Sequence, residues 1–259
     1  MPAPTNGLVL FWNMETLNGS LMKDLAGNAN DGIITGAADS SGKVSRARLF
    51  DAIDDFIQVP HAVTLDVGLL ADSYSVMCWA SFTDVTVDRA IITKPRYVGG
   101  SNRAPFAVRS LTTTGKIRFD IFDGTNNPFV DSTSAINDGT WHHVAAVRSA
   151  ARDKLFVYMD GISQASTADT TTTTSTNSSA FRVGRRGGID TDIYFQGSID
   201  EVRVYNRALD ADAVSAVYND TQNYPTASLV DLGELTRPFR PFRRVNRWST
   251  LHKSEFQDR

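Results

Sequence analysis

The chain has 259 residues, of which 41% are hydrophobic and 21% charged, an ordinary composition for a folded chain with a substantial core. No run of about eighteen apolar residues occurs, so no membrane-spanning helix is expected. The segment Met1–Asn6 also lacks the charged start and apolar run of a secretory signal. The single cysteine, Cys78, excludes an intrachain disulfide and is expected to be a small buried side chain.

Charge is divided unevenly along the chain. Residues 235–259 hold seven Lys or Arg and two acids, a net charge of +5, whereas residues 1–234 hold nineteen bases and twenty-seven acids, a net charge of −8. The composition changes near Tyr224-Pro225. This change predicts a domain over residues 1–220 and a basic arm over residues 221–259.

Short runs of β-forming residues, separated by turn signals, follow one another over most of the chain. The predicted strands are Gly7–Met14, Arg46–Val59 in two pieces, Ser73–Phe82, Arg89–Thr93, Phe106–Ser110, Lys116–Asp123, Thr140–Arg148, Lys154–Asp160, Ala180–Arg185 and Gly197–Asn206. In one of them Ile117, Phe119 and Ile121 alternate with polar residues, as the period of a half-buried strand requires. Three Asp-Gly pairs predict tight turns: Asp123-Gly124, Asp138-Gly139 and Asp160-Gly161.

One helix is expected after the last strand. Asp210 is suited to cap Ala211–Tyr218, in which Val214 and Val217 have helical spacing. The Thr-rich segment Thr170–Thr174 predicts an exposed hairpin loop. No helical pattern separates the strands, so a βαβ topology is not expected.

Four segments occur in a definite order: Leu10–Met14 followed by Asp24–Gly32, Phe56–Pro60 leading into Tyr74–Trp79, Asp138–Val144 followed by Val157–Gly161, and Gly197–Leu209. Together they resemble the laminin-G-like, concanavalin A-like jelly-roll superfamily over residues 7–219. The resemblance implies an all-β fold, a two-sheet antiparallel jelly-roll sandwich with one short helix, to which an extended C-terminal arm is added. It also implies mostly non-catalytic roles in carbohydrate or protein binding and in adhesion, without assigning a ligand.

The loop Asp24–Asp31 (DLAGNAND) is rich in the oxygen donors that a calcium ion prefers. The resemblance places a structural calcium where this loop meets the strand that carries Asp200. An inward carboxylate at Asp200 needs a cation or hydrogen-bond donors, because it shares a strand face with apolar residues. The alternative is an ordinary Asx-turn loop, with Asp200 capped by backbone amides. The predicted calcium ligands are Asp24, Asn28, Asn30 and Asp200.

Catalytic residues are not predicted. Jelly-roll glycosidases need two carboxylic groups roughly 5–9.5 Å apart across one bond, and no predicted strand carries two alternating acids in an apolar setting. Asp200 and Glu201 are adjacent and point to opposite faces of a strand, as do His142 and His143. The segment Gly184–Gly188 (GRRGG) lacks the remainder of a phosphate-binding loop and is predicted to be a turn.

The basic arm alternates arginine with aromatic residues, and its two prolines exclude a helix. We expect it to dock onto other protein subunits, with arginines pairing acids and aromatic rings filling pockets. Nucleic-acid binding is disfavoured because the rest of the chain is acidic, and self-association is the remaining alternative. The predicted partner-binding residues are Arg237, Phe239, Arg240, Phe242, Arg243, Arg244, Arg247 and Trp248.

These features favour a non-enzymatic structural or adhesion component of an assembly, such as the capsid decoration, head fibre or tail of a bacteriophage virion. Such a protein would reside in the cytoplasm before assembly and would display a lectin-like sandwich to a cell-surface or environmental glycan. One alternative is a free, extracellular, calcium-dependent carbohydrate-binding module, which does not explain the arm. The other is a glycoside hydrolase, which does not fit the missing acid pair. No membrane partner is expected.

Overall fold

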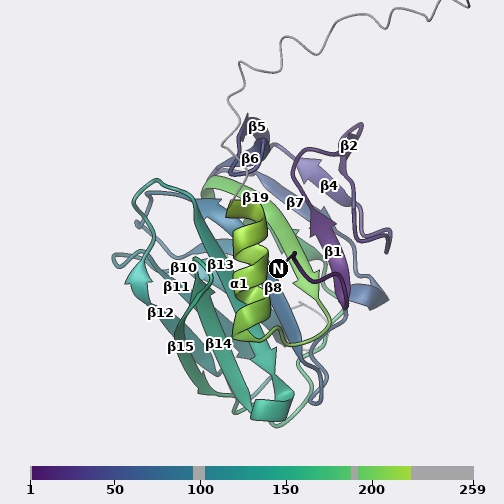
Figure 1. Cartoon of the computed structure of the whole chain (residues 1–259), viewed down its shortest axis with the longest axis vertical. Helices are drawn as coiled ribbons and strands as arrows, with labels where there is room; N and C mark the ends of the chain where they lie inside the picture. The colour runs from purple at the N-terminus through teal and green to yellow at the C-terminus, as the bar shows by residue number, and fades with distance from the viewer. Residues whose placement is uncertain (1, 96–102, 188–191, 223–259) are drawn as a thin grey trace, which may run out of the picture. The chain divides into compact units, whose positions relative to one another are not determined.

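The structure, a computed structural model, describes residues 2–95, 103–187 and 192–222. These residues form two large antiparallel sheets, a small two-stranded sheet and one α-helix (Figure 1), which confirms the predicted all-β jelly-roll sandwich. None of the described helices is long and apolar enough to cross a membrane. The predicted arm cannot be compared with the structure, because residues 223–259 lie outside the described part.

The first sheet has eight strands and is covered on its outer face by the helix, so we call it the helix-covered sheet. Its strand order is β15-β14-β13-β8-β19-β6-β5, with β1 added against β19. The strands are β1 (Leu8–Trp12), β5 (Ala38–Ser41), β6 (Arg46–Asp51), β8 (Tyr74–Ser81), β13 (His142–Ser149), β14 (Lys154–Met159), β15 (Ile162–Ala168) and β19 (Gln196–Tyr205). Strands β8, β13 and β19 are buried on both faces over most of their length.

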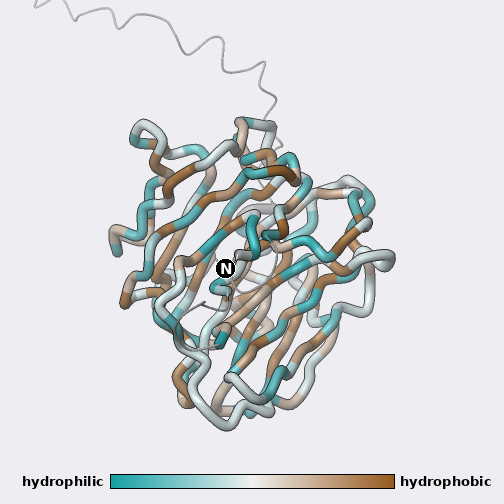
Figure 2. Tube along the Cα trace, turned by 180° about the vertical axis from the view of Figure 1, so that it is seen from behind, coloured by the Kyte–Doolittle hydropathy of each residue, from teal (hydrophilic) through white to brown (hydrophobic). Residues whose placement is uncertain are grey.

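The second sheet has nine strands in the order β12-β11-β10-β9-β16-β7-β4-β3-β2. They are β2 (Leu17–Asn18), β3 (Leu21–Met22), β4 (Gly32–Thr35), β7 (Phe56–Val59), β9 (Arg89–Lys94), β10 (Ala104–Ser110), β11 (Lys116–Phe122), β12 (Phe129–Ala135) and β16 (Phe181–Val183). The hairpin β17 (Arg185–Arg186) and β18 (Ile193–Tyr194) forms the small sheet. Because no described α-helix covers the outer face of the nine-stranded sheet, we call it the open sheet; Figure 2 views the molecule from the side opposite to the helix.

The main core lies between the two sheets. In β11, Ile117, Phe119 and Ile121 are fully buried while the residues between them are partly exposed, which confirms the predicted alternation. Trp12 meets Phe181 edge to face, with ring centroids 5.6 Å apart. Burying each large apolar side chain stabilises the fold by about 1.5–3 kcal/mol. The core therefore fixes which side chains of the open sheet point outward.

The helix α1 (Ala211–Gln222) covers a second apolar cluster on the outer face of the helix-covered sheet (Figure 1). Its Val214 and Val217 are buried against Met77 and Tyr205 of that sheet. Asp210 Oδ1 accepts a hydrogen bond from the backbone of Ala213 at 2.9 Å, so the predicted N-cap is confirmed. The helix runs four residues beyond its predicted end, and it leaves the open sheet as the broader uncovered face.

The predicted Asp-Gly turns are confirmed, since the glycines of all three pairs have positive φ. Asp160 and Gly161 both have positive φ (51° and 76°) and join β14 to β15, as the twist of a hairpin favours. The segment Thr170–Thr174 is not a hairpin loop, because it connects β15 to β16 in the other sheet. It is also anchored: Asp123 Oδ2 accepts a hydrogen bond from the backbone of Thr172 at 2.8 Å.

Two 3₁₀ turns complete the described elements, η1 (Val63–Leu65) and η2 (Ala150–Arg152). Cys78 on β8 is fully buried, as its apolar surroundings predict.

Candidate functional site

Asp24 organises the loop that the sequence singled out for calcium. Its carboxylate is buried, with 8% of the residue exposed. Oδ1 accepts hydrogen bonds from the backbone amides of Phe11 (3.0 Å) and Ala26 (2.9 Å), and Oδ2 accepts them from Asn28 and Asn30 (both 3.1 Å). Four amide donors around one carboxylate compensate its charge without a cation. This is the Asx-type arrangement that was the alternative to calcium.

Asn28 and Asn30 fasten the same loop to β1. Asn30 Nδ2 donates to Val9 O at 2.7 Å, its Oδ1 accepts from the Thr64 hydroxyl at 3.0 Å, and its carbonyl accepts from Trp12 Nε1 at 2.9 Å. Asn28 Nδ2 donates to Val9 O at 3.2 Å. These bonds occupy the side-chain oxygen that Asn30 would offer to a cation. Three of the four predicted ligands thus lie together, in bonds that hold the edge of the sandwich.

Asp200 lies elsewhere, on β19, and is fully buried. Its Oδ2 accepts from the backbone of Val44 at 2.9 Å and its Oδ1 from the backbone of Glu201 at 2.8 Å. Among the described residues it makes no hydrogen bond or ion pair with the three other predicted ligands. Burial raises the pKa of this carboxyl well above its usual value, and the nearby acids Glu201 and Glu15 raise it further. Asp200 is therefore a buried carboxylate that accepts hydrogen bonds from two backbone amides.

The adjacent polar pairs diverge as predicted. Glu201 bonds Arg203 Nη2 at 2.6 Å, whereas Asp200 accepts hydrogen bonds from the backbone amides of Val44 and Glu201. His142 Nδ1 meets Asp160 at 2.8 Å, whereas His143 is buried against Trp79 at a centroid distance of 5.4 Å. Each of the four side chains is thus engaged in a separate structural contact.

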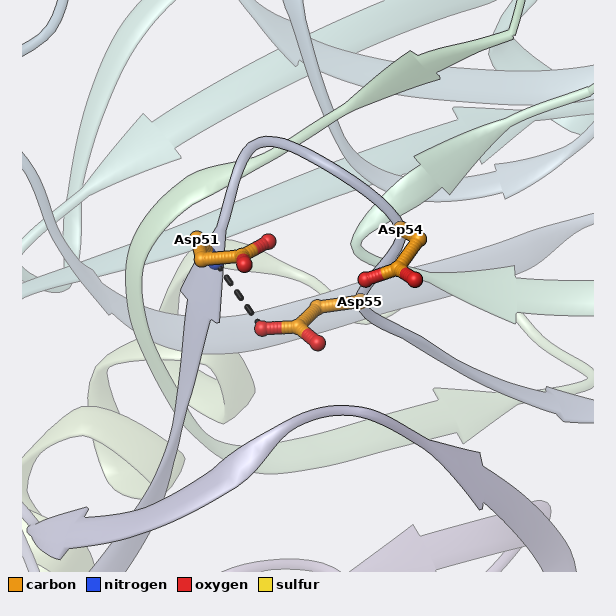
Figure 3. A group of neighbouring side chains, drawn as sticks. All are labelled: Asp51, Asp54 and Asp55. Atoms are coloured by element: carbon orange, nitrogen blue, oxygen red, sulfur yellow. Dashed lines mark hydrogen bonds between the residues drawn. The ribbon is translucent and has the colours of Figure 1, made fainter.

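Three aspartates gather at the turn between β6 and β7, a group that the sequence reasoning did not select (Figure 3). Asp55 Oδ2 accepts from the backbone of Asp51 at 3.0 Å, and Asp51 Oδ1 accepts from Ile53 at 2.8 Å. Carboxylate oxygens of Asp51, Asp54 and Asp55 lie within 4.8 Å of one another. Asp51 also borders a groove of about 470 Å³ that runs to Gln196. In the sequence this group is visible as three aspartates within five residues. Two of the carboxylates, those of Asp51 and Asp55, accept the hydrogen bonds that hold the turn.

The outer face of the open sheet carries a cluster of arginines and aromatic rings. The guanidinium of Arg185 lies over the ring of Phe56 at 4.7 Å and over that of Tyr194 at 5.5 Å. Arg182 lies beside them, with Nε 3.4 Å from Gln58 Oε1. We call Phe56, Arg182, Arg185 and Tyr194 the arginine–aromatic cluster; all four residues are partly exposed.

Register explains why these residues meet. In β16, Phe181 and Val183 enter the core, so Arg182 between them points outward, opposite Gln58 of β7 and Thr93 of β9. The β17–β18 hairpin is tied to β9 by hydrogen bonds from the Thr93 hydroxyl to Arg185 O (2.8 Å) and from Arg89 Nη1 to Tyr194 O (3.0 Å). The prediction of a turn at Gly184–Gly188 is therefore wrong for Arg185–Arg186, which form strand β17.

Other arginines on or near the open sheet are neutralised by aspartates. The pairs are Arg89–Asp84 (2.6 Å), Arg109–Asp88 (2.6 Å), Arg109–Asp120 (3.0 Å) and Arg118–Asp131 (2.6 Å). The carboxylates of these four aspartates are thus engaged in ion pairs. The predicted partner-binding residues between Arg237 and Trp248 lie outside the described residues.

Comparison with solved structures agrees with the fold. The binding domain of paraclostridial mosquitocidal protein 1 superposes with a TM-score of 0.68 at 15% identity, over 85% of this chain and 53% of that one. The binding domain of botulinum neurotoxin DC in complex with SialylT gives 0.63 at 12%, over 85% and 52%. This chain therefore spans about half the length of these toxin domains.

A single-domain match comes from domain 4 of AbnA, an extracellular GH43 arabinanase from Geobacillus stearothermophilus, in complex with arabinotriose. Its TM-score is 0.63 at 20% identity, over 82% of this chain and 98% of that one. No curated protein sequence matches the chain. The family model for the concanavalin A-like lectin/glucanase superfamily, of the laminin G type, matches residues 51–215. The chain belongs to the concanavalin A-like lectin/glucanase superfamily.

Proposed function

We propose that this chain is a non-enzymatic adhesion protein that binds carbohydrate through the outer face of its open sheet. The arginine–aromatic cluster carries the proposal. Partly exposed aromatic rings supply the apolar surface against which a sugar ring packs, and guanidinium and amide groups supply donors for its hydroxyls. On the helix-covered sheet α1 lies across the central strands, and an arginine–aromatic contact described there, that of Arg152 with Phe156, is longer, at 5.8 Å.

A hydrolytic role is not favoured by the acids that the structure describes. Glu201 is ion-paired with Arg203, Asp200 is capped by two amides, and the aspartates of the open sheet named above are held by arginines. A glycosidase needs one carboxyl to donate a proton and another to act as base or nucleophile. Neither role suits carboxylates engaged in this way.

Sugar binding is tested by titrating the full chain with soluble polysaccharides of different classes in affinity electrophoresis. We expect retardation by at least one class, and Phe56→Ala should weaken it about tenfold by removing a ring of the cluster. Phe129→Ala is the matched control, because this ring also lies under an arginine, Arg118, at 4.0 Å. Equal losses in the two variants, or no retardation by any polysaccharide, would contradict the proposal.

The basic arm of residues 221–259 is proposed to anchor the sandwich to other protein subunits of an assembly. The charge division along the chain and the arginine–aromatic pattern of the arm support this role. A bacteriophage virion is the assembly we favour, and a free extracellular carbohydrate-binding module is the alternative.

Deleting residues 225–259 separates folding from attachment. All the described elements end at Gln222, so the truncated chain should fold with little change in its thermal midpoint while losing incorporation into its parent particle. Circular dichroism and mass spectrometry of purified particles measure the two outcomes. Unfolding would make the arm part of the sandwich, and retained incorporation would place docking on the sandwich surface.

A structural calcium is the remaining part of the proposal. At Asp24 and Asn30 a calcium ion would compete with the hydrogen bonds that their side-chain oxygens already accept. Asp200, a buried carboxylate near Glu15, fits a calcium site better. A cation there would compensate the buried charge.

A further inference from the structure

We propose that Arg182 and Arg185 bind the carboxylate of an acidic sugar, while the rings of Phe56 and Tyr194 bind its apolar side. This inference rests on the proposed carbohydrate binding and deepens it, because it names the chemical class of the ligand. Two observations carry it. The guanidinium groups of the arginine–aromatic cluster outnumber the described carboxylates beside them, and neighbouring side chains hold Arg185 in place.

Arg185 is positioned by stacking and by one ion pair. Its guanidinium contacts the rings of Phe56 and Tyr194, whose centroids are 6.5 Å apart, and Nη2 bonds Asp192 Oδ2 at 2.6 Å. Nε is buried without a hydrogen-bond partner. The two cation–π contacts and the ion pair hold the guanidinium in place, so little side-chain freedom would be lost on binding an anion.

Arg182 has no acid of its own. Among the described residues no carboxylate lies within 4.0 Å of its guanidinium, and its one hydrogen bond, to Gln58, is long at 3.4 Å. Burial lowers the pKa of Arg182, and the positive charge of Arg185 lowers it further. The neighbouring Asp192 is already bonded to Arg185. Among the described residues these two adjacent guanidinium groups therefore share one carboxylate, and a second anion would balance them.

The backbone leaves room for this guanidinium. A Cβ atom added to Gly187 would lie 2.3 Å from Arg182 Nη1, so only glycine permits the side chain to stay where it is. Two other arginines of this face, Arg109 and Arg118, each form an ion pair with an aspartate. Arg182 differs from Arg109, Arg118 and Arg185 in that no described carboxylate forms an ion pair with it.

The surroundings favour a carboxylated sugar over a simple anion. An inorganic ion would satisfy the two guanidinium groups but would not contact the parts of the Phe56 and Tyr194 rings that remain exposed beside Arg185. A sugar acid presents a planar carboxylate beside a ring with apolar C–H groups, and so matches both halves of the cluster. Uronic acids and sialic acids share this chemistry.

The test is isothermal titration of the full chain with polygalacturonate, with polysialic acid, and with fully methyl-esterified pectin as the uncharged match of the first. We expect one of the acidic polymers to bind about tenfold or more tightly than the ester, and the affinity to fall as salt is raised. Binding of polygalacturonate would indicate a uronic acid as the ligand, and binding of polysialic acid would indicate a sialic acid.

Arg182→Ala should reduce affinity for the acidic polymer about tenfold, and Arg182→Lys should recover only part of it because it cannot bond bidentately. Arg118→Ala, on the same face, should leave affinity unchanged. Thermal unfolding of each variant verifies its fold, and the lysine variant keeps the test valid if alanine is not tolerated.

The outcomes separate the two proposals. Preference for the ester or for neutral polymers would overturn the acidic-sugar site and leave carbohydrate binding standing. Undiminished binding of the acidic polymer by Arg182→Ala would assign it to another part of the chain, such as the basic arm, and would also overturn the site. If no polysaccharide binds, both proposals fall.

Discussion

Replacing Asp24 with alanine is expected to destabilise the domain by about 3–5 kcal/mol, the largest effect of a single substitution that we predict. The carboxylate holds four backbone amides, and the variant would leave those donors without their acceptor. One of them, the amide of Phe11, lies in β1, and Asn30 is also bonded to that strand, since its carbonyl accepts a hydrogen bond from Trp12 Nε1. Urea-induced unfolding at neutral pH measures the loss.

The same experiment distinguishes capping from calcium binding. Asp24→Ala should cost as much in EDTA as in millimolar calcium, whereas a calcium at Asp200 would add stability in calcium only, about 2.7 kcal/mol at a hundredfold excess over Kd. Asp200→Asn should then remove the calcium-dependent part. Asp212→Ala is the control, an exposed aspartate in the first turn of α1 whose loss should change stability by less than about 0.5 kcal/mol. If the Asp24→Ala loss disappears in EDTA, Asp24 is a metal ligand after all.

Sequence patterns located the central strands because apolar residues mark them. Strands such as Tyr74–Ser81 and Lys116–Phe122 were predicted within a residue or two. The strands Ala38–Ser41 and Ile162–Ala168 were missed, and both lie at the ends of the helix-covered sheet with mostly exposed residues. An edge strand without a buried face has no alternation to detect, and its pairing depends on the backbone of its neighbour.

The candidate sites divide in the same way. The close spacing of Asp24, Asn28 and Asn30 in the sequence was enough to group them. It could not show that most of their hydrogen-bond partners are backbone groups, because a side-chain pattern carries no information about those groups. The arginine–aromatic cluster could not be predicted, because Phe56 and Arg185 are distant in sequence and meet only through the register of β7, β16 and β9. The local sequence Gly184–Gly187 gave no indication that Arg185 would contact the rings of Phe56 and Tyr194.

A buried polar layer beneath α1 depends equally on tertiary structure. Glu201 has a positive φ of 52° within β19, where the register to β8 shifts, and its side chain turns to Arg203. His143 lies in the same layer, 1% exposed, against the stacked rings of Trp79 and Tyr218. Its Nδ1 has no hydrogen-bond partner. The fold therefore accommodates a neutral imidazole there and penalises a charged one.

This burial makes the stability of the domain depend on pH through His143. Burial lowers the pKa of His143 to about 3, and the charge of Arg203 lowers it further, against 6.5 for the exposed side chain. Between these values the unfolded chain binds a proton that the folded chain does not, so stability falls as pH falls below 6.5. Glu201 acts in the opposite direction: burial raises its pKa to about 7, and its contribution falls as pH rises from 4.5 to 7.

Comparison with His143→Phe isolates the histidine, because Glu201 is present in both proteins. We expect nearly equal stabilities at pH 7.5, since phenylalanine can keep the edge contact with Trp79. Below pH 6.5 the wild-type chain should lose about 1.4 kcal/mol per pH unit relative to the variant, the linkage limit for one proton. Urea unfolding at half-unit pH steps measures the difference, and the ring resonances of His143 should not titrate above pH 4.5. A constant difference between the two proteins, or titration of His143 near pH 6.5, would show that the helix admits water and a proton to this layer.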